Sequence, residues 1–228
     1  MIKSGSTRKY MLYAIGEIAL VVIGILIALQ INNWNQNNKD STLLDQYYTN
    51  ILADLQQTLD FMDRAIYLEG LFSEKANKSL AELKQPEDSI NLDSLELWLT
   101  QMVGTVTFRI IDDSFESIKS SGHLSLIKDP ELKNELTRYY GEIKRVEKMI
   151  DKNNAWLELT FGDYIRNNEV GFYYDRSGTL KNDHLKLPRE SYRLSKQLNT
   201  KASNRHFKAL RNMKKKTEEL IISIQSVQ

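Results

Sequence analysis

The sequence predicts an all-α protein in which one N-terminal transmembrane helix leads into an elongated antiparallel helical bundle. A long apolar run with a single charge occupies residues 10–34, and three later segments repeat apolar residues at helical spacing. These patterns divide the chain into a tail at 1–9, a transmembrane helix at 10–34, a juxtamembrane linker at 35–41 and a helical extracytoplasmic domain at 42–228.

The run 10–34 has the length and composition of a membrane-spanning helix. A helix of about 20 apolar residues crosses the hydrocarbon core of a bilayer, and aromatic rings such as that of Trp34 prefer the headgroup level. A cleaved signal peptide would have a shorter apolar core and a small-x-small cleavage site, which this stretch lacks. A helix of a soluble domain fits less well, because residues 18–29 are apolar on every face.

The residues that flank the run predict its orientation. Lys3, Arg8 and Lys9 lie before it in a tail without acids, whereas asparagines follow it, with Lys39 beside Asp40. Positive residues close to a span stay in the cytoplasm. We therefore expect the N-terminus inside and everything after the span outside.

The amino-acid composition excludes several kinds of functional site. The chain has no cysteine, which excludes disulfides, thiolate metal sites, a cysteine nucleophile and a lipid-modified cysteine anchor. The net charge of +1 hides an asymmetry: residues 40–118 hold 15 acids and 5 bases, whereas 181–228 hold 4 acids and 12 bases. A basic tail could contact nucleic acid or anionic lipid. We favour packing of the basic last helix near the acidic first one.

The first long segment of the domain predicts a helix that Asp40 or Ser41 caps, or that continues from the span, and that runs to about Leu83. Its core face, with Thr58 in one slot, consists of Leu44, Tyr48, Ile51, Leu55, Met62 and Ala65. Gln85 to Ser89 then form a turn.

Shorter elements follow. Asp93 starts a short helix that ends near Gly104, and the β-branched residues 105–111 predict an extended piece. Asp112 or Asp113 caps the next helix, and Gly122 is placed like a C-terminal cap.

Asp129 before Pro130 is a strong signal for the start of the next long helix, which we expect to reach about Asn167. Its stripe of alternating four- and three-residue spacing, typical of bundles, consists of Leu132, Leu136, Tyr139, Ile143, Val146, Ile150, Leu157 and Tyr164. The aromatics Phe172 to Tyr174 in the irregular stretch 168–188 are expected to close one end of the core. A last helix, near Ser203 to Ser226, has a core face of Phe207, Leu210, Met213, Leu220, Ile224 and Val227.

Residues 13–35 read YAIGEIALVVIGILIALQINNWN, and 115–129 read FESIKSSGHLSLIKD, followed by the segment from Glu131 to Tyr140. In these stretches the chain resembles an uncharacterised, flavobacterial-type family of single-pass membrane proteins that is defined as a domain of unknown function. The resemblance implies a bacterial protein, and with the predicted orientation it implies an inner-membrane location with a periplasmic domain. It implies no activity, cofactor or catalytic residue.

No spacing indicates catalysis or a bound metal. His123, His184 and His206 match no metal motif, and Asp183 beside His184 is not the signal of a catalytic triad. We therefore expect no catalytic, cofactor-binding or metal-binding residues, and no cofactor.

The span itself carries a candidate intramembrane interface made of Gly16, Glu17, Gly24 and Ala28. A charge within a span is costly and often functional, although a carboxyl near the interface can also snorkel or sit protonated. Gly24 and Ala28 form a small-xxx-small pair that lets two helices approach closely, although such pairs also arise by chance. The interface would serve a second copy of the chain or a partner membrane protein.

The expected function is a non-enzymatic, membrane-anchored helical scaffold or interaction module that has the lipid bilayer as a partner and binds no nucleic acid. The alternative is a ligand-binding sensory domain of the cell envelope, which needs a pocket between helices lined by Phe172 to Tyr174. An enzyme would need a polar cluster that the spacing of the sequence does not reveal.

Overall fold

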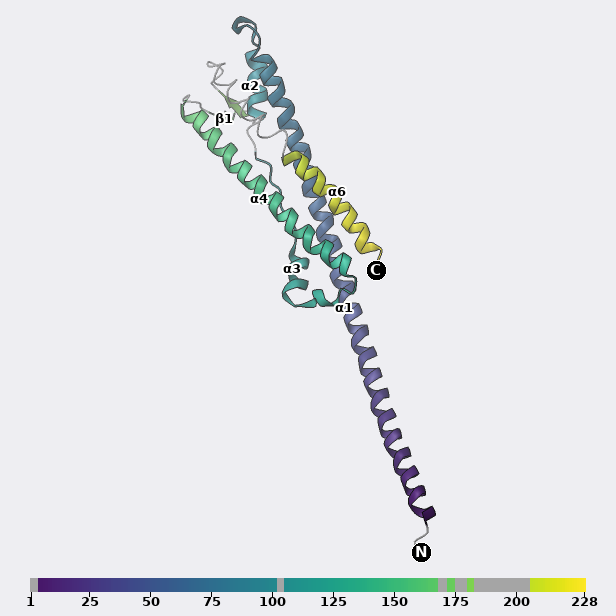
Figure 1. The fold of residues 1–228 in the computed structure, drawn as a ribbon. Coiled ribbons are helices and arrows are strands. Elements are labelled where there is room, and N and C mark those ends of the chain that lie inside the picture. Colours follow the sequence, from purple (N-terminus) through teal and green to yellow (C-terminus); the bar gives the residue numbers. More distant parts are fainter. Residues whose placement is uncertain (1–3, 102–104, 168–171, 175–179, 183–205) are drawn as a thin grey trace.

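The computed structural model describes residues 4–101, 105–167, 172–174, 180–182 and 206–228. The elements in chain order are α1 (Ser4–Glu82), η1 (Glu87–Ser89), α2 (Leu92–Gln101), α3 (Asp113–Ser120), η2 (His123–Leu126), α4 (Pro130–Asn167), β1 (Phe172–Tyr174), β2 (Leu180–Asn182) and α6 (His206–Gln225). The predicted all-α class is confirmed (Figure 1). Within the described residues, strand structure is limited to the antiparallel hairpin of β1 and β2.

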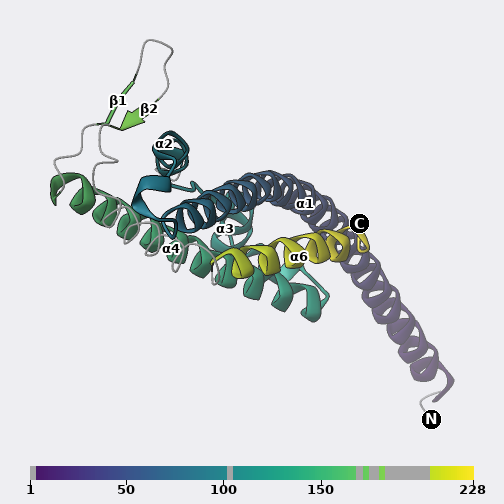
Figure 2. The ribbon, with the colours of Figure 1, turned by 90° about the horizontal axis from the view of Figure 1, so that it is seen from above.

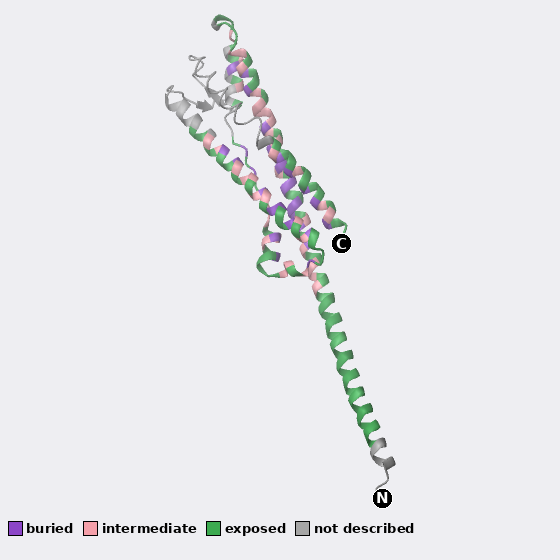
Figure 3. Cartoon of the chain, viewed as in Figure 1, coloured by how far each residue is buried: buried purple, intermediate pink, exposed green. Residues whose placement is uncertain are grey.

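Helix α1 is a single helix of 79 residues. The sequence left open whether a new helix begins near Asp40, and the structure shows that α1 continues through this point. Residues 10–39 are exposed on all sides, so the first half of α1 projects from the rest of the protein as a stalk (Figure 3). By length and composition, this exposed part is apolar enough to cross a membrane.

The second half of α1 packs with α4 and α6 into a three-helix body (Figure 1). Helix α6 runs antiparallel to α1, because Lys214 pairs with Asp63 and Gln228 donates to Thr49. Helices α1 and α4 run in the same direction, and residues 105–112 run antiparallel to both (Figure 1). Seen from above, α6 lies along both of them (Figure 2).

The predicted apolar stripes form the core. Ile51 and Leu55 of α1, Ile143 of α4, and Leu220 and Ile224 of α6 are fully buried in one cluster. Val227, predicted on the same face of the last helix, is 45% exposed, so its assignment to the core was wrong. The reason is that α6 ends at Gln225, before this residue can take its place on the stripe.

Some predicted core residues have side chains that lie outside the described part of the structure. They are Leu157 and Tyr164 of α4 and Phe207 of α6. Gly104, the predicted end of the short helix, also lies outside the described residues.

Opposite charges meet as predicted between the basic last helix and the acidic first one. Lys214 Nζ of α6 lies 2.5 Å from Asp63 Oδ1 of α1, and Lys216 of α6 forms an ion pair with Glu142 of α4. Each pair is solvent-exposed, and exposed pairs contribute roughly 0–1 kcal/mol to stability. These ion pairs therefore contribute mainly to the orientation of α6. Burial of apolar side chains supplies most of the free energy that stabilises its packing.

Residues 105–112 form an extended segment between α1 and α4. Val106, Phe108 and Ile110 are buried, whereas Thr105, Thr107 and Arg109 are exposed. This alternation is that of a β-strand, as the β-branched sequence predicts. The segment nevertheless has no partner strand within the described residues.

Side chains of the two flanking helices take the place of a partner strand. Asn154 Nδ2 donates to the Val106 carbonyl at 2.8 Å. The Ile110 N–H donates to Glu147 Oε1 at 3.2 Å, and the Ile111 N–H donates to Thr58 Oγ1 at 3.2 Å. A buried backbone group without a partner costs free energy comparable to a lost hydrogen bond, so these polar side chains allow the segment to be buried.

The start of α3 is capped from a distance. Asp112 occupies the N-cap position but makes no capping hydrogen bond, so the predicted local cap was wrong. Asp54 Oδ2 of α1 accepts from the Ser114 N–H at 3.0 Å instead. Asp112 is drawn away because its Oδ2 lies 2.6 Å from Lys144 Nζ of α4. That contact raises the pKa of Lys144, chiefly through its hydrogen bonds to Asp112 and Glu116.

Two other predicted boundaries are confirmed. Gly122 follows α3 with φ of 76°, a left-handed conformation that glycine adopts without strain. Asp129 Oδ1 accepts from the Glu131 N–H at 2.8 Å, and α4 begins at Pro130.

We predict that Ile143→Asp lowers the free energy of unfolding by at least about 3 kcal/mol, because it buries an unpaired charge in the centre of the core. Lys148→Asp, an exposed change on the same helix, should alter stability by less than about 0.5 kcal/mol. Urea unfolding of the full chain in detergent, followed by circular dichroism, measures both. Equal effects would show that the α4 stripe faces solvent.

We predict that Asp54→Ala costs about 1–2 kcal/mol, as loss of an N-cap does elsewhere, because the Ser114 N–H loses its acceptor. Asp54→Asn keeps an acceptor oxygen and should cost less, while Asp60→Ala, on the exposed face of α1, should be close to neutral. The same unfolding measurement ranks the three variants. A harmless Asp54→Ala would mean that water or a local residue caps α3.

Candidate functional site

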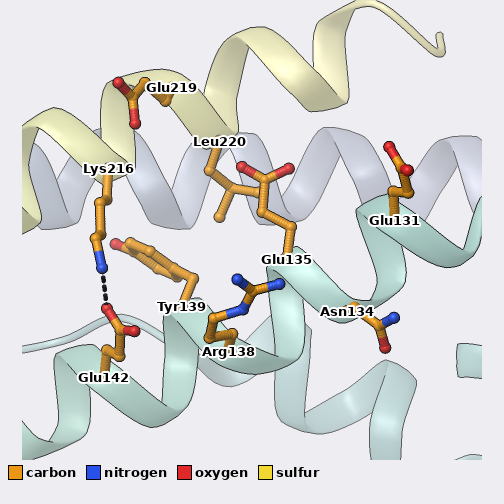
Figure 4. Close-up of a pocket in the computed structure, with 9 residues that line it drawn as sticks. All are labelled: Glu131, Asn134, Glu135, Arg138, Tyr139, Glu142, Lys216, Glu219 and Leu220. Atoms are coloured by element: carbon orange, nitrogen blue, oxygen red, sulfur yellow. Dashed lines mark hydrogen bonds and ion pairs between the residues drawn. The ribbon is translucent and has the colours of Figure 1, made fainter.

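A groove of about 480 Å³ lies between α4 and α6 (Figure 4). Its lining residues are Glu131, Asn134, Glu135, Arg138, Tyr139, Glu142, Lys216, Glu219 and Leu220. Figure 4 shows the ring of Tyr139 beside the Lys216–Glu142 ion pair, with the other charged side chains around the rim. The groove is open to solvent, and charged side chains make up most of its lining.

The floor of the groove is a fixed hydrogen-bonded unit. Thr217 Oγ1 donates to the Met213 carbonyl at 2.8 Å, so the Tyr139 hydroxyl, 2.9 Å from Thr217 Oγ1, acts as the donor to it. Burial raises the pKa of Tyr139 well above its ordinary value. A neutral phenol whose proton is already engaged is a poor base or nucleophile, so Tyr139 has a structural role.

The rim is charged and mostly acidic. The hydrogen bond from Lys216 lowers the pKa of Glu142, which keeps this pair ionised at neutral pH. Glu131 and Glu135 add carboxylates on α4, and Glu219 lies 3.5 Å from Lys215 on α6. Four carboxylates and two cations thus meet at the rim, contributed by Glu131, Glu135, Glu142, Glu219, Arg138 and Lys216.

A shallower depression of about 330 Å³ lies further along the same two helices. It is mainly apolar, and its floor combines Val146 and Met149 of α4 with Ala209 and Met213 of α6. The charged groove and this depression therefore both lie on the α4–α6 face.

Glu69 is a buried acid within the stripe of α1. It lies between Met62 and Ala76 at core spacing and is 6% exposed. Its Oε2 has no hydrogen-bond partner in the described part of the chain. Burial raises the pKa of Glu69 to about 7. Acids with such shifts concentrate at functional sites, but no described groove reaches Glu69.

The predicted intramembrane residues all lie in the exposed half of α1. Gly24 and Ala28 share one face, Glu17 is close to that face, and Gly16 lies at its edge. A Cβ added at either glycine would meet no atom within 4 Å. The face is therefore open within this chain, and association through it stays a prediction.

Of the three histidines, the structure describes the side chain of His123. His123 Nδ1 lies 3.0 Å from the hydroxyl of Tyr47, in a contact near the base of the body. Asp183 and His184, and the side chain of His206, lie outside the described residues. Among the residues that are described, no group of three or more histidines and acids is placed to hold a metal ion.

The aromatic segment Phe172–Tyr174 forms strand β1, paired in register with Leu180–Asn182. No sequence pattern predicted this hairpin; the stretch was expected only to be irregular. The side chains of β1 lie outside those described, so neither the expected closing of the core nor a ligand pocket there is tested.

Comparison with models of known protein families gives a match. The model for a family of unknown function, DUF6090, matches residues 17–155, which is more than half of the chain. The chain belongs to the DUF6090 family. The matched region begins inside the apolar half of α1 and ends within α4, so α6 lies beyond it. No curated protein and no solved structure matches the chain.

The DUF6090 region contains polar residues whose structural roles the sequence patterns did not predict. Asp54, Glu147 and Asn154 each support a distant backbone group. Thr58 gave a weak signal, because it interrupts an apolar stripe. Beyond the matched region, Thr217 fills a gap in the α6 stripe in the same way.

We predict that Glu69 makes stability depend on pH. Its pKa in the unfolded chain is near 4.5 and in the folded chain about 7, so the folded state holds the proton more tightly. The stabilisation is complete below pH 4.5, falls as pH rises towards about 7 and stays lost above it. Glu69→Gln should abolish this slope and stabilise the protein at pH 8 by up to about 3 kcal/mol.

Urea unfolding at pH 5, 6, 7 and 8 measures the slope. Asp60→Asn, which removes an exposed acid from the same helix, should retain it. An unchanged slope in Glu69→Gln would show that Glu69 is ionised in the folded protein at all these pH values.

Proposed function

We propose that this protein is a single-pass membrane protein of the bacterial inner membrane whose periplasmic domain is a non-enzymatic scaffold or interaction module. The observation that carries the proposal is the continuity of α1, which is both the apolar stalk and the spine of the domain core. The tail at 1–9 would lie in the cytoplasm and residues 42–228 in the periplasm.

Three features support the membrane assignment. The stalk buries none of its apolar surface within the chain, which in water would be strongly unfavourable. Tyr10, Tyr13 and Trp34 stand at its two ends, as in an aromatic belt. The DUF6090 match begins at Glu17 and so includes most of the apolar stretch together with the first part of the domain, which supports a span that is retained with the domain.

Continuity of α1 supports a scaffold. A helix rises about 1.5 Å per residue, so the segment from Trp34 to Tyr48, the first buried residue, would hold the domain roughly 20 Å from the membrane. A rigid spacer of this kind presents the α4–α6 face at a fixed height and orientation. Such presentation suits a protein that positions a partner.

The sensory alternative is less well supported. The groove that the described residues form is lined by charged side chains and is open, whereas ligand pockets are usually enclosed and largely apolar. Phe172 to Tyr174 would have to supply the pocket, and their side chains are outside those described.

We predict that a phosphatase that is active only outside the cytoplasm, fused after Gln228, is active, whereas green fluorescent protein fused there is dark. The reason is the excess of basic residues before the span. Fusions after Lys9 should give the reverse pattern and serve as the control. A fluorescent fusion at Gln228 would place the domain in the cytoplasm and contradict the proposal.

A further inference from the structure

Five asparagines lie between residues 32 and 38, in a part of α1 that touches nothing else in the described chain. Asparagine has a low helix propensity, because its side chain competes for backbone hydrogen bonds. An exposed helix that is polar all round either bridges between domains, is supported by pairs of its own side chains, or is not stable by itself. The continuity of α1 through this stretch therefore favours a partner element that the described residues do not supply.

We propose that a second copy of this chain packs against α1 from Glu17 to Thr42, in a parallel two-stranded coiled coil that crosses the membrane surface. This inference rests on the proposed single-pass insertion and adds the partner, its orientation and its register. The contact positions follow alternating four- and three-residue spacing and are Glu17, Val21, Gly24, Ala28, Ile31, Asn35, Asn38 and Thr42.

Membrane insertion fixes the orientation of the two copies. Both would enter with the same end inside, so their helices must run parallel. In a parallel pair, identical residues at the a and d positions of the heptad face one another. Asn35 takes an a position. Its carboxamide is both a hydrogen-bond donor and an acceptor, so it can pair with Asn35 of the second copy. Such a pair favours a dimer with one register.

The flanking positions are complementary between copies. Trp34 falls at a g position and Lys39 at the e position five residues later, which are neighbours across a parallel dimer. Both are exposed in the single chain, Trp34 by 67%. A lysine ammonium over the indole face would add a cation–π contact from each side of the pair.

The hydrogen bond already present in this stretch lies on the outward side. Gln36 Nε2 donates to Asp40 Oδ1 at 2.8 Å, and these residues take b and f positions. The side chains of Asn35 and Asn38 have no such contact with described residues, so they remain available for the seam.

The described part of the domain leaves this face of α1 open to a second copy. At about 100° per residue, Asn35 and Thr42 lie roughly opposite the core stripe of Ile51 and Met62 on α1. The seam ends where Gln228, just after α6, reaches Thr49 at 3.4 Å. The two domains would then separate above this level, with each α4–α6 face accessible.

Because the chain contains no cysteine, single cysteines placed in the full-length protein test the seam directly. Asn35→Cys and Asn38→Cys lie on the seam, whereas Asn33→Cys and Asn37→Cys replace the same residue type at outward positions. After mild oxidation in bacterial membranes, the seam variants should form several-fold more of a band at twice 26.5 kDa. Trp34→Ala should reduce cross-linking of Asn35→Cys, while Gln36→Ala should not.

The other outcomes overturn the dimer. Equal cross-linking at all four positions would mean random collision, and a preference for Asn33→Cys or Asn37→Cys would mean another face. A cross-linked band of different mass would identify a different partner. Carbonate extraction of the same membranes separates the two hypotheses: an integral chain that does not cross-link refutes the dimer alone, whereas an extracted chain refutes the anchoring and the parallel dimer together.

Discussion

The body depends on how one buried, extended segment satisfies its backbone. Helices α1 and α4 run in the same direction, so the chain must return between them, and residues 105–112 do so within the core. Thr58, Glu147 and Asn154 supply donors and acceptors where a sheet would supply a neighbouring strand. Without them, burial of Val106, Phe108 and Ile110 would leave backbone polar groups without hydrogen bonds in an apolar environment. The free-energy cost would be comparable to the free energy gained by burying the three apolar side chains.

These contacts also decide the position of α3. Asp54 caps it from α1, and Lys144 of α4 holds Asp112 and Glu116, each at 2.6 Å. Phe115 then stacks on Tyr140 with ring centroids 4.1 Å apart. One layer of polar contacts and one aromatic pair thus lock the short helix to both long ones, so the base of the body behaves as a single packed unit.

The sequence predicts the helices well because their signals are local. The Asp129–Pro130 start, the left-handed Gly122 and the apolar stripes around Ile51 and Ile143 each depend on a few neighbouring residues. The side-chain contacts that support the extended segment and cap α3 join residues 37 to 60 positions apart, so no local pattern encodes them. The Asp112 cap failed for that reason: a distant lysine competes for its carboxylate.

The candidate surfaces were harder to predict than the fold. A groove between α4 and α6 depends on the register in which Tyr139 meets Thr217, and register between helices is a tertiary property. Glu69 has core spacing that the sequence shows, yet only its surroundings reveal that its carboxyl is buried. Gly24 and Ala28, by contrast, were predictable as one face, because a single helix suffices to place them.

Helix α6 completes a core that the DUF6090 region begins. Leu210, Leu220 and Ile224 are fully or almost fully buried against the stripes of α1 and α4, although they lie beyond residue 155. Removal of α6 would expose Met62 and Tyr139 at the centre of the cluster. The family match therefore marks the shared part of the chain, and the folded unit is larger than that part.

The two halves of α1 are coupled by the absence of any hinge between them. Sharp kinks in helices arise mainly at proline, at glycine or at inserted side chains, and residues 25–69 contain neither proline nor glycine. A rotation of the stalk about its axis must then turn the core stripe by the same angle. The face that packs the domain and the exposed face of the stalk are fixed relative to each other by helical phase alone, so the orientation of the stalk about its axis determines the direction in which the α4–α6 groove points.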